Sequence, residues 1–255
     1  MTGPPSLGRV ERYLGDRLRD GPVHFTLIDP DKSPGDRAAA VAREAVGQGS
    51  HLILLGGSTG ISREVIGRAA AAVKHAVAAP VVIFPEGPGS LAPEADAVLF
   101  MSLLNSRNLD LVIRTHSQAA PAVRAMGLEP IPMGYLVVAP GMRVGEVGQV
   151  DAVARDDLAS ATGYALAAQF LGMRFVYLEA GSGAPEPVPA AMVRAVRASL
   201  AIPVIVGGGI RSGAEAQTLL HAGADVLVTG TITEEEGVGE GFRAILDEIR
   251  RARGE

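Results

Sequence analysis

The chain has 255 residues, of which 47% are hydrophobic and only 4% aromatic, with no Cys and no Trp. A chain of this length suits one large domain or two small ones, and α/β barrels of this size commonly form a single unit. The formal net charge of −5 argues against a nucleic-acid-binding protein, and the lack of Cys excludes disulfides, thiolate metal sites and a Cys nucleophile.

Eight short apolar runs are spaced along the chain and predict strands. Most are rich in Val, Ile and Leu without polar alternation, which is typical of strands covered on both faces. In chain order the runs are Val23–Ile28, His51–Leu55, Val81–Phe84, Ala97–Met101, Ile131–Val138, Phe175–Glu179, Pro203–Gly207 and Asp225–Thr229.

Longer helical patterns lie between these runs. The predicted helices are Gly35–Gly47, Ser62–Val77, Leu109–Met126, Asp156–Leu171, Pro189–Leu200, Gly213–Ala222 and Glu240–Ala252, with an extra N-terminal helix at Leu7–Arg19. The segment EGPGSLAPEAD at 86–96 is short and rich in Pro and Gly, so the third βα unit should be irregular.

Eight βα units predict a single-domain (β/α)8 TIM barrel over residues 1–255. An open doubly wound sheet is the alternative, which eight strands in a chain of this length disfavour.

The N-terminal segment has no apolar signal core, and no stretch approaches about 18 consecutive apolar residues. We therefore expect a cytoplasmic protein. A lipid substrate would have to be drawn from a membrane surface by transient contact.

Glycines follow the seventh and eighth predicted strands, in GGGIRS at 207–212 and in Thr229-Gly230-Thr231. Glycine lets the backbone approach an anion closely, and these two loops form the usual phosphate site of such barrels. The sequence therefore favours a phosphate site here over loops that merely turn the chain, although many barrel enzymes share this feature.

Acidic residues follow two other strands. Asp29 and Asp31 after the first strand suit Mg²⁺, but Asp29 could instead cap a turn before Pro30. Glu179 ends the sixth strand and would point into the barrel mouth as a general base or hydroxyl ligand, unless it is a structural, hydrogen-bonded Glu. Tyr177 shares its side of the strand.

The segment MSLLNS at 101–106 carries polar residues that could line a pocket and two leucines, Leu103 and Leu104, that could face an apolar ligand. Core packing is the alternative that the periodicity favours. Tyr135 is a further pocket candidate. The histidines are scattered without metal-ligand spacing and suit structural or surface roles: His24, His51, His75, His116 and His221.

Taken together, the motifs resemble those of the geranylgeranylglyceryl phosphate synthase family. They are LIDPDK at 27–32, GGS at 56–58, MSLLNS at 101–106, PMGYLVV at 132–138, YLEAGSGA at 177–184 and GGGIRS at 207–212. The resemblance implies a Mg²⁺-dependent prenyltransferase. Such an enzyme moves a polyprenyl group, here expected to be geranylgeranyl, from its diphosphate to the primary hydroxyl of sn-glycerol 1-phosphate. The resemblance also implies a homo-oligomer.

The same resemblance implies site residues. Asp29 and Ser58 would hold the Mg²⁺ that grips the diphosphate. The glycerol phosphate would contact Tyr177, Leu178, Glu179, Ala180, Gly181, Ser182 and Gly183, with Glu179 as the catalytic residue near the attacking hydroxyl. Its phosphate would bind at Gly208, Gly209, Gly230 and Thr231.

Three departures from the family pattern bear on the substrate. Glu86 follows the third strand where many relatives have Gly and then Asn, Thr231 stands where relatives often have Asn, and residues 107–110 lack the bulky aromatics of some relatives. These departures leave the prenyl length and the identity of the acceptor, which could be another three-carbon phosphate, open.

Two other function classes remain as alternatives. A sugar-phosphate isomerase or lyase could use the same barrel, but Lys32 and Lys74 are the only lysines, which counts against a Schiff-base mechanism. A non-catalytic barrel would not require acidic, hydroxyl and glycine groups at five strand ends.

Overall fold

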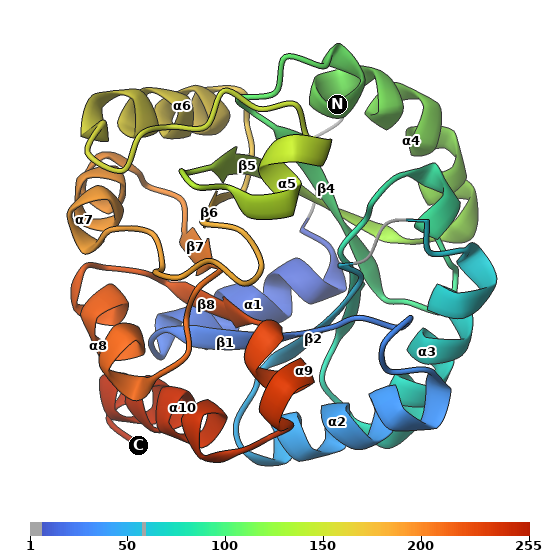
Figure 1. Ribbon diagram of the computed structural model, residues 1–255. Coiled ribbons are helices and arrows are strands. Elements are labelled where there is room, and N and C mark those ends of the chain that lie inside the picture. The colour runs from blue at the N-terminus through green and yellow to red at the C-terminus, as the bar shows by residue number, and fades with distance from the viewer. Residues whose placement is uncertain (1–6, 58–59) are drawn as a thin grey trace.

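The computed structural model describes residues 7–57 and 60–255, and its eight parallel strands close into a barrel in chain order (Figure 1). The last strand pairs with the first, so the sheet has no open edge. The predicted barrel is confirmed. The strands are β1 (Val23–Ile28), β2 (Leu52–Leu55), β3 (Val81–Ile83), β4 (Ala97–Leu103), β5 (Glu129–Val137), β6 (Phe175–Glu179), β7 (Val204–Gly207) and β8 (Val226–Thr229).

An outer ring of helices covers the barrel. It contains α2 (Gly35–Gly47), α3 (Arg63–Ala76), α4 (Thr115–Met126), α6 (Leu158–Phe170), α7 (Ala190–Ser199), α8 (Gly213–His221) and α10 (Glu240–Arg253). Apart from α4, their ends lie close to those predicted. Among residues 7–57 and 60–255, no helix has both the length and the apolar character needed to cross a membrane.

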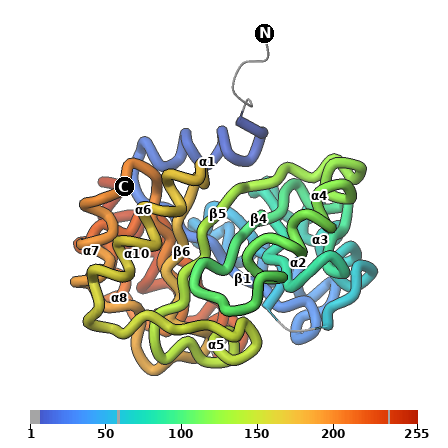
Figure 2. Tube along the Cα trace, turned by 90° about the horizontal axis from the view of Figure 1, so that it is seen from above, coloured from blue at the N-terminus to red at the C-terminus, as the bar shows by residue number. Residues whose placement is uncertain are grey.

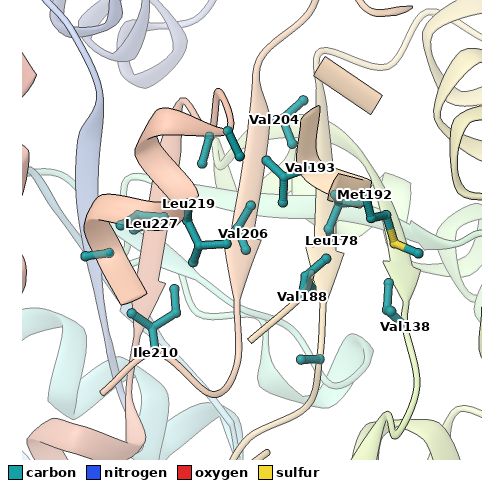
Figure 3. Close-up of a cluster of buried hydrophobic side chains, with 14 of the residues drawn as sticks. Val138, Leu178, Val188, Met192, Val193, Val204, Val206, Ile210, Leu219 and Leu227 are labelled. Carbon is teal, nitrogen blue, oxygen red and sulfur yellow. The ribbon is translucent and has the colours of Figure 1, made fainter. Parts of the chain in front are cut away.

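Each strand sends alternate side chains into the barrel and toward the helices. In β6, Phe175 and Tyr177 belong to the interior cluster, whereas Val176 and Leu178 pack outward against the helices. Figure 3 shows part of this outer layer, where Leu178 lies beside Val193 of α7 and Val206 of β7. Burial of each such side chain contributes about 1.5–3 kcal/mol relative to exposure, which explains the Val- and Leu-rich strands.

The N-terminal helix α1 (Arg9–Arg19) lies at the end of the barrel opposite α5, as Figure 2 shows. Both carboxylate oxygens of Glu129 on β5 accept hydrogen bonds from the first turn of α1, from the N–H groups of Val10 (2.7 Å) and Glu11 (2.8 Å). A helix has free N–H groups at its start, so this carboxylate caps it and fixes it across the barrel floor.

The third βα unit is irregular, as predicted. Between β3 and β4 the chain forms only a 3₁₀ turn, η1 (Pro88–Ser90). The fourth helix also departs from a regular helix, because it begins with a π-helical turn, η2 (Asp110–Arg114), before α4 starts. The prediction of one α-helix over Leu109–Met126 was therefore wrong in its first part. A π turn commonly marks a functional site, and η2 lies beside the cavity described below.

Two short helices were not predicted: α5 (Met142–Val147) and α9 (Thr231–Glu236). Both lie inside the ring of outer helices in Figure 1. The segment GMRVGEVG that contains α5 has three glycines, which disfavour a helix in isolation. Contacts with the barrel stabilise it, including Val144 against the interior cluster and a 3.1 Å bond from the Gly141 N–H to the Ala180 carbonyl.

Candidate active site

A cavity of about 650 Å³ opens at the carboxyl ends of the strands. This is the end at which barrel enzymes place their functional residues. The cavity has two chemically different parts. One is polar and is formed by the loops after β6, β7 and β8, and the other is apolar and extends along β4 toward η1 and α4.

Glu179 lies where the two parts meet. It is the last residue of β6 and is only 6% exposed, and its Oε2 accepts a 3.0 Å hydrogen bond from the Tyr135 hydroxyl. Its Oε1 accepts a 2.6 Å bond from the Gly181 N–H. Burial raises the pKa of Glu179, while the hydrogen bonds from Gly181, Tyr135 and Tyr177 oppose that rise. A buried carboxylate with a raised pKa is suited to accepting a proton.

The glycine loop after β7 packs directly against this carboxylate. Gly208 has a φ of +80°, and a Cβ there would lie 2.4 Å from Glu179 Oε1 and 2.7 Å from the Gly181 backbone nitrogen. Glycine is needed at this position for both conformation and space. Gly208 therefore shapes the surroundings of Glu179 as well as lining the cavity.

The rest of the polar part is rich in small groups and hydrogen-bond donors. The hydroxyls of Ser182 and Thr231 lie 3.0 Å apart and join the loop after β6 to the start of α9, which follows β8. The backbone of Gly183, Gly209 and Gly230 completes the lining, together with Arg211. Hydroxyls, glycine backbone groups and one guanidinium form a surface suited to a phosphate group.

Asp29 lies at the rim of the cavity, where its neighbours Asp31, Lys32 and Gly57 line the wall. Its side chain is 3% exposed, and its Oδ1 accepts a 3.0 Å bond from the Asp31 N–H, so the turn considered above is formed. Its Oδ2 lies 3.7 Å from Lys32 Nζ, which also pairs at 2.7 Å with Glu234 of α9.

The metal prediction rests on Asp29 and Ser58, and Ser58 lies outside the described residues. Across residues 7–57 and 60–255, no group of three or more His, Cys, Asp or Glu side chains could hold a metal ion. A single carboxylate at the cavity rim nevertheless fits Mg²⁺, which commonly takes one or two protein carboxylates and completes its shell with water and substrate phosphates.

The apolar part occupies the space left by the missing helix of the third unit. Its lining comes from η1 and the loop that follows, β4, η2 and α4, and includes Leu91, Val98, Phe100, Leu103, Leu111, Ala119 and Val123. We call this part the apolar groove. Pockets of this size and composition commonly hold hydrophobic ligands.

His116 on α4 is the main polar side chain of the apolar groove. Its Nε2 lies 2.7 Å from the Met101 carbonyl, so Nε2 carries the proton, and its ring packs edge-on against Phe100 at 4.8 Å. Its buried Nδ1 has no hydrogen-bond partner within the described part of the chain. The interpretation of all histidines as structural or surface residues therefore omitted one that lines the cavity.

Most of the predicted substrate-binding residues line this one cavity: Tyr177, Glu179, Ser182, Gly183, Gly208, Gly209, Gly230 and Thr231. Leu178 and Ala180 do not. Their side chains are 0% exposed and face the helix layer, because alternate residues of a strand point to opposite faces. Gly181 lies behind Glu179 and donates to it.

The polar side chains of MSLLNS bind backbone groups instead of lining the cavity. Ser102 donates to the Val112 carbonyl at 2.7 Å, Asn105 to the Val137 carbonyl at 2.9 Å, and Ser106 to the Gly148 carbonyl at 2.6 Å. Leu103 lines the cavity, whereas Leu104 packs outward.

Other lining residues were not identified from sequence. Phe84 follows β3, and α5 contributes Arg143, Val144 and Val147. A lone aromatic after a short strand carries no pattern, and α5 has no helical signal, so neither could have been found without the fold.

The PcrB family model matches residues 16–252 of the chain. The geranylgeranylglyceryl phosphate synthase of Pyrococcus horikoshii is 46% identical over 97% of this chain and 98% of its own length. The protein of the same name from Thermoplasma acidophilum is 47% identical over 92% and 93%.

Solved structures agree with these matches. A crystal structure of the (S)-3-O-geranylgeranylglyceryl phosphate synthase of Thermoplasma acidophilum in complex with its substrate sn-glycerol-1-phosphate has a TM-score of 0.91 and 46% identity. It covers 96% of this chain and 100% of that one. A thiamine phosphate pyrophosphorylase from Pyrococcus furiosus, at a TM-score of 0.59 and 17% identity, shares the fold alone.

Proposed function

The chain belongs to the PcrB family and is an enzyme, and we propose that it transfers a geranylgeranyl group from its diphosphate to the primary hydroxyl of sn-glycerol 1-phosphate. The observation that carries this proposal is one cavity with a phosphate-compatible half and an apolar half that meet at the buried carboxylate of Glu179. A phosphorylated acceptor and a long apolar donor need this combination, whereas a sugar-phosphate isomerase has no use for the apolar groove.

The acceptor would bind with its phosphate among Ser182, Gly209, Gly230 and Thr231. Glu179 would then accept the proton of the primary hydroxyl, and the acceptor oxygen would attack the first carbon of the donor. The carbon–oxygen bond to the diphosphate breaks, and the diphosphate leaves with the electron pair. Holding both reactants in line supplies much of the acceleration.

The donor tail would lie in the apolar groove, between β4 and α4. Hydrophobic contact there positions the reactive end at Glu179 and excludes water from the tail. A geranylgeranyl tail is proposed because the relatives are geranylgeranylglyceryl phosphate synthases. Residues 107–110 lack bulky aromatics, so a longer prenyl diphosphate is the main alternative donor.

Mg²⁺ is proposed as the cofactor, held by Asp29 with Ser58, and it would offset the negative charge of the leaving diphosphate. The test is Asp29→Asn with Asp31→Asn as its control. Asp29→Asn should raise the Mg²⁺ concentration for half-maximal turnover by about tenfold or more, as expected for the loss of one carboxylate ligand, whereas the exposed Asp31 should matter less. The same Mg²⁺ response in both variants would remove Asp29 from the metal site.

We also propose that the protein forms a homo-oligomer. Phe170 and Leu171, at the end of α6, are 78% and 76% exposed, and burying them against a second copy would remove this apolar surface from water. Analytical ultracentrifugation of Phe170→Glu should show a smaller species than the wild-type protein. A monomeric wild-type protein would contradict the proposal.

The decisive experiment combines purified protein, Mg²⁺ and labelled glycerol 1-phosphate with C15, C20 and C35 diphosphates in parallel, supplied from lipid vesicles and from detergent. An extractable ether product, formed fastest with the C20 donor, is expected. Faster transfer with C35 would correct the chain length. No product with any donor from folded protein would overturn the reaction and direct attention to another three-carbon phosphate acceptor.

A further inference from the structure

Aromatic residues are scarce in this chain, with six Phe, four Tyr and no Trp. Three of them nevertheless meet at the barrel mouth: Phe84 after β3, Tyr135 on β5 and Tyr177 on β6. Their ring centroids are 5.8 Å apart for Phe84 and Tyr135, 6.2 Å for Phe84 and Tyr177, and 5.0 Å for the two tyrosines. All three pairs pack edge to face. We call these residues the aromatic cluster.

The aromatic cluster lies at the junction of the two parts of the cavity, and all three residues line it. On the polar side, the Tyr135 hydroxyl reaches Glu179 Oε2 at 3.0 Å. On the apolar side, the rings pack with Leu99 and Met101 of β4, which line the start of the apolar groove. The aromatic cluster therefore connects the apolar lining of β4 to the immediate surroundings of Glu179.

We propose that the aromatic cluster stabilises the positive charge that develops on the first carbon of the prenyl donor as its bond to the diphosphate breaks. This inference rests on the proposed function. The electron pair of the broken bond leaves with the diphosphate, the acceptor oxygen supplies the pair for the new ether bond, and its proton passes to Glu179. The rings exchange no electrons or protons, and they act through the negative charge of their faces.

Position supports this role. The acceptor hydroxyl belongs at Glu179 and the tail belongs in the apolar groove, so the reacting carbon has to lie between them, beside the rings. The cations Lys32, Arg143 and Arg211 line the cavity from segments that follow the strands, whereas Tyr135 and Tyr177 line it from β5 and β6 themselves. A cationic centre in a water-poor site gains most from neighbouring π faces.

Both tyrosines remain neutral phenols, because burial and the Glu179 carboxylate raise their pKa well above the usual value of 10. Phe84 is the more accessible ring, since Tyr135 and Tyr177 are 5% and 2% exposed and Phe84 is half-buried. Phe84 has no hydroxyl, so its contribution can be measured without disturbing the hydrogen bonds of Glu179.

The test replaces Phe84 with mono-, di- and trifluorinated phenylalanine, which progressively weakens the negative face at nearly constant shape. The kcat should fall stepwise with each fluorine, while the KM values for both substrates stay within about twofold. Phe84→Leu should lower kcat by roughly 5- to 30-fold. The same series at Phe242 of α10, which is buried with its ring edge-on to His24 and is not among the residues that line the cavity, is the matched control and should leave kcat unchanged.

A flat kcat across the Phe84 series in an active enzyme would overturn the inference and leave the proposed function intact. An equal decline at Phe84 and Phe242 would also overturn it, since a general loss of packing would then be the cause. No ether product from the unmodified enzyme with any donor would remove the proposed function, and this inference with it.

Discussion

The loops after β6, β7 and β8 face the segment between β3 and α4 across one cavity, and the two regions are built in opposite ways. The first region is regular, because each of its strands is followed by a glycine-containing loop and then a helix. These loops pack so closely that a Cβ at Gly208 would overlap Glu179. The second is irregular, with η1 in place of a helix and a π turn before α4. Close packing fixes polar groups, and missing structure leaves room for an apolar tail.

The two regions should therefore bind substrate in different ways, the polar half through directional hydrogen bonds and the apolar groove through hydrophobic contact. Fixed donors and a buried carboxylate in the polar half should control the chemical step. Contacts in the apolar groove are non-directional and should control which donor is used more than how fast it reacts. Variants in the two halves should therefore change different kinetic constants, in a descending order of effect.

The largest effect is expected in the polar half, from Glu179→Gln. The variant keeps the size of the side chain but removes the proton acceptor, so kcat should fall by about 10²–10⁴-fold. The burial that raises the pKa of Glu179 also means that ionising it costs stability as pH rises through its folded pKa. The neutral variant should therefore be at least as stable at pH 8. Thermal unfolding beside steady-state kinetics checks both, and a near wild-type kcat would remove Glu179 from the reaction.

The strand-end logic explains why the position of Glu179 at the barrel mouth could be predicted from sequence alone. Carboxyl ends of parallel strands meet at one end of a barrel, so Glu179, Gly208 and Thr231 were expected together despite their separation in the chain. The resemblance carries over the whole motif YLEAGSGA and so implies a substrate contact at Leu178. The two-residue period of a strand, however, directs the Leu178 side chain away from Tyr177 and Glu179.

The apolar groove could not be predicted in the same way. The segment EGPGSLAPEAD predicts an irregular third βα unit. Whether side chains fill the space left by the missing helix, however, depends on how η1 and α4 pack. The contacts of Phe84 with Tyr135 and Tyr177 could not be predicted either, because the three residues are distant in the chain and meet only in the folded barrel. The helix α5 depends on tertiary contacts that its own glycine-rich sequence does not encode locally.

The second prediction tests close packing in the polar half with two glycines of similar conformation. Gly208 and Gly183 have φ values of +80° and +75°, but a Cβ at Gly183 would meet no atom of residues 7–57 and 60–255 within 4 Å. Each change to Ala should cost about 1–2 kcal/mol of stability from left-handed strain. Only Gly208→Ala should displace Glu179.

Gly208→Ala should therefore lower kcat by roughly ten- to a hundredfold, because a displacement of about 1 Å at a reacting group can have that effect. Gly183→Ala should stay within a few-fold of wild type. Chemical denaturation measures the loss of stability caused by the strain. Steady-state kinetics measures the loss of kcat caused by the displacement of Glu179. Equal kcat values in the two variants would show that the approach of Gly208 to Glu179 has no bearing on the reaction.

The third prediction concerns the apolar half. Ala119 on α4 is 8% exposed and lines the apolar groove, so Ala119→Phe should shorten the space for the tail. The kcat/KM for the C20 donor should fall by about tenfold relative to a C10 donor, as expected for the loss of a few methylene contacts. The KM for glycerol 1-phosphate should not change.

The neighbouring Ala120 is exposed and does not line the cavity, so Ala120→Phe controls for the added ring. Competition between C10 and C20 donors in one reaction gives the ratio directly. An unchanged ratio in Ala119→Phe, or an equal change in both variants, would show that the donor tail does not bind in the apolar groove.

The smallest effect is expected at the junction of the halves, from Tyr135→Phe. The variant keeps the ring but removes the hydroxyl that donates to Glu179, and that hydrogen bond lowers the pKa of the carboxyl. Without it the pKa of Glu179 should rise further, so more of the carboxyl is protonated at a given pH. The acidic limb of the kcat profile should therefore move to higher pH. The rate should fall by roughly 3- to 10-fold near neutrality, within the range for a hydrogen bond to a charged group, and recover at alkaline pH.

Tyr164→Phe, on the outer face of α6 and 36% exposed, is the matched control and should leave the profile in place. The result distinguishes two contributions of one residue, because the hydroxyl serves the polar half and the ring faces the apolar one. Recovery at alkaline pH would show that the ring alone supports the transition state once Glu179 is ionised. A loss of kcat that persists at every pH would mean that the hydroxyl also contacts the reactants, and a limb displaced to lower pH would contradict the hydrogen bond to the carboxylate.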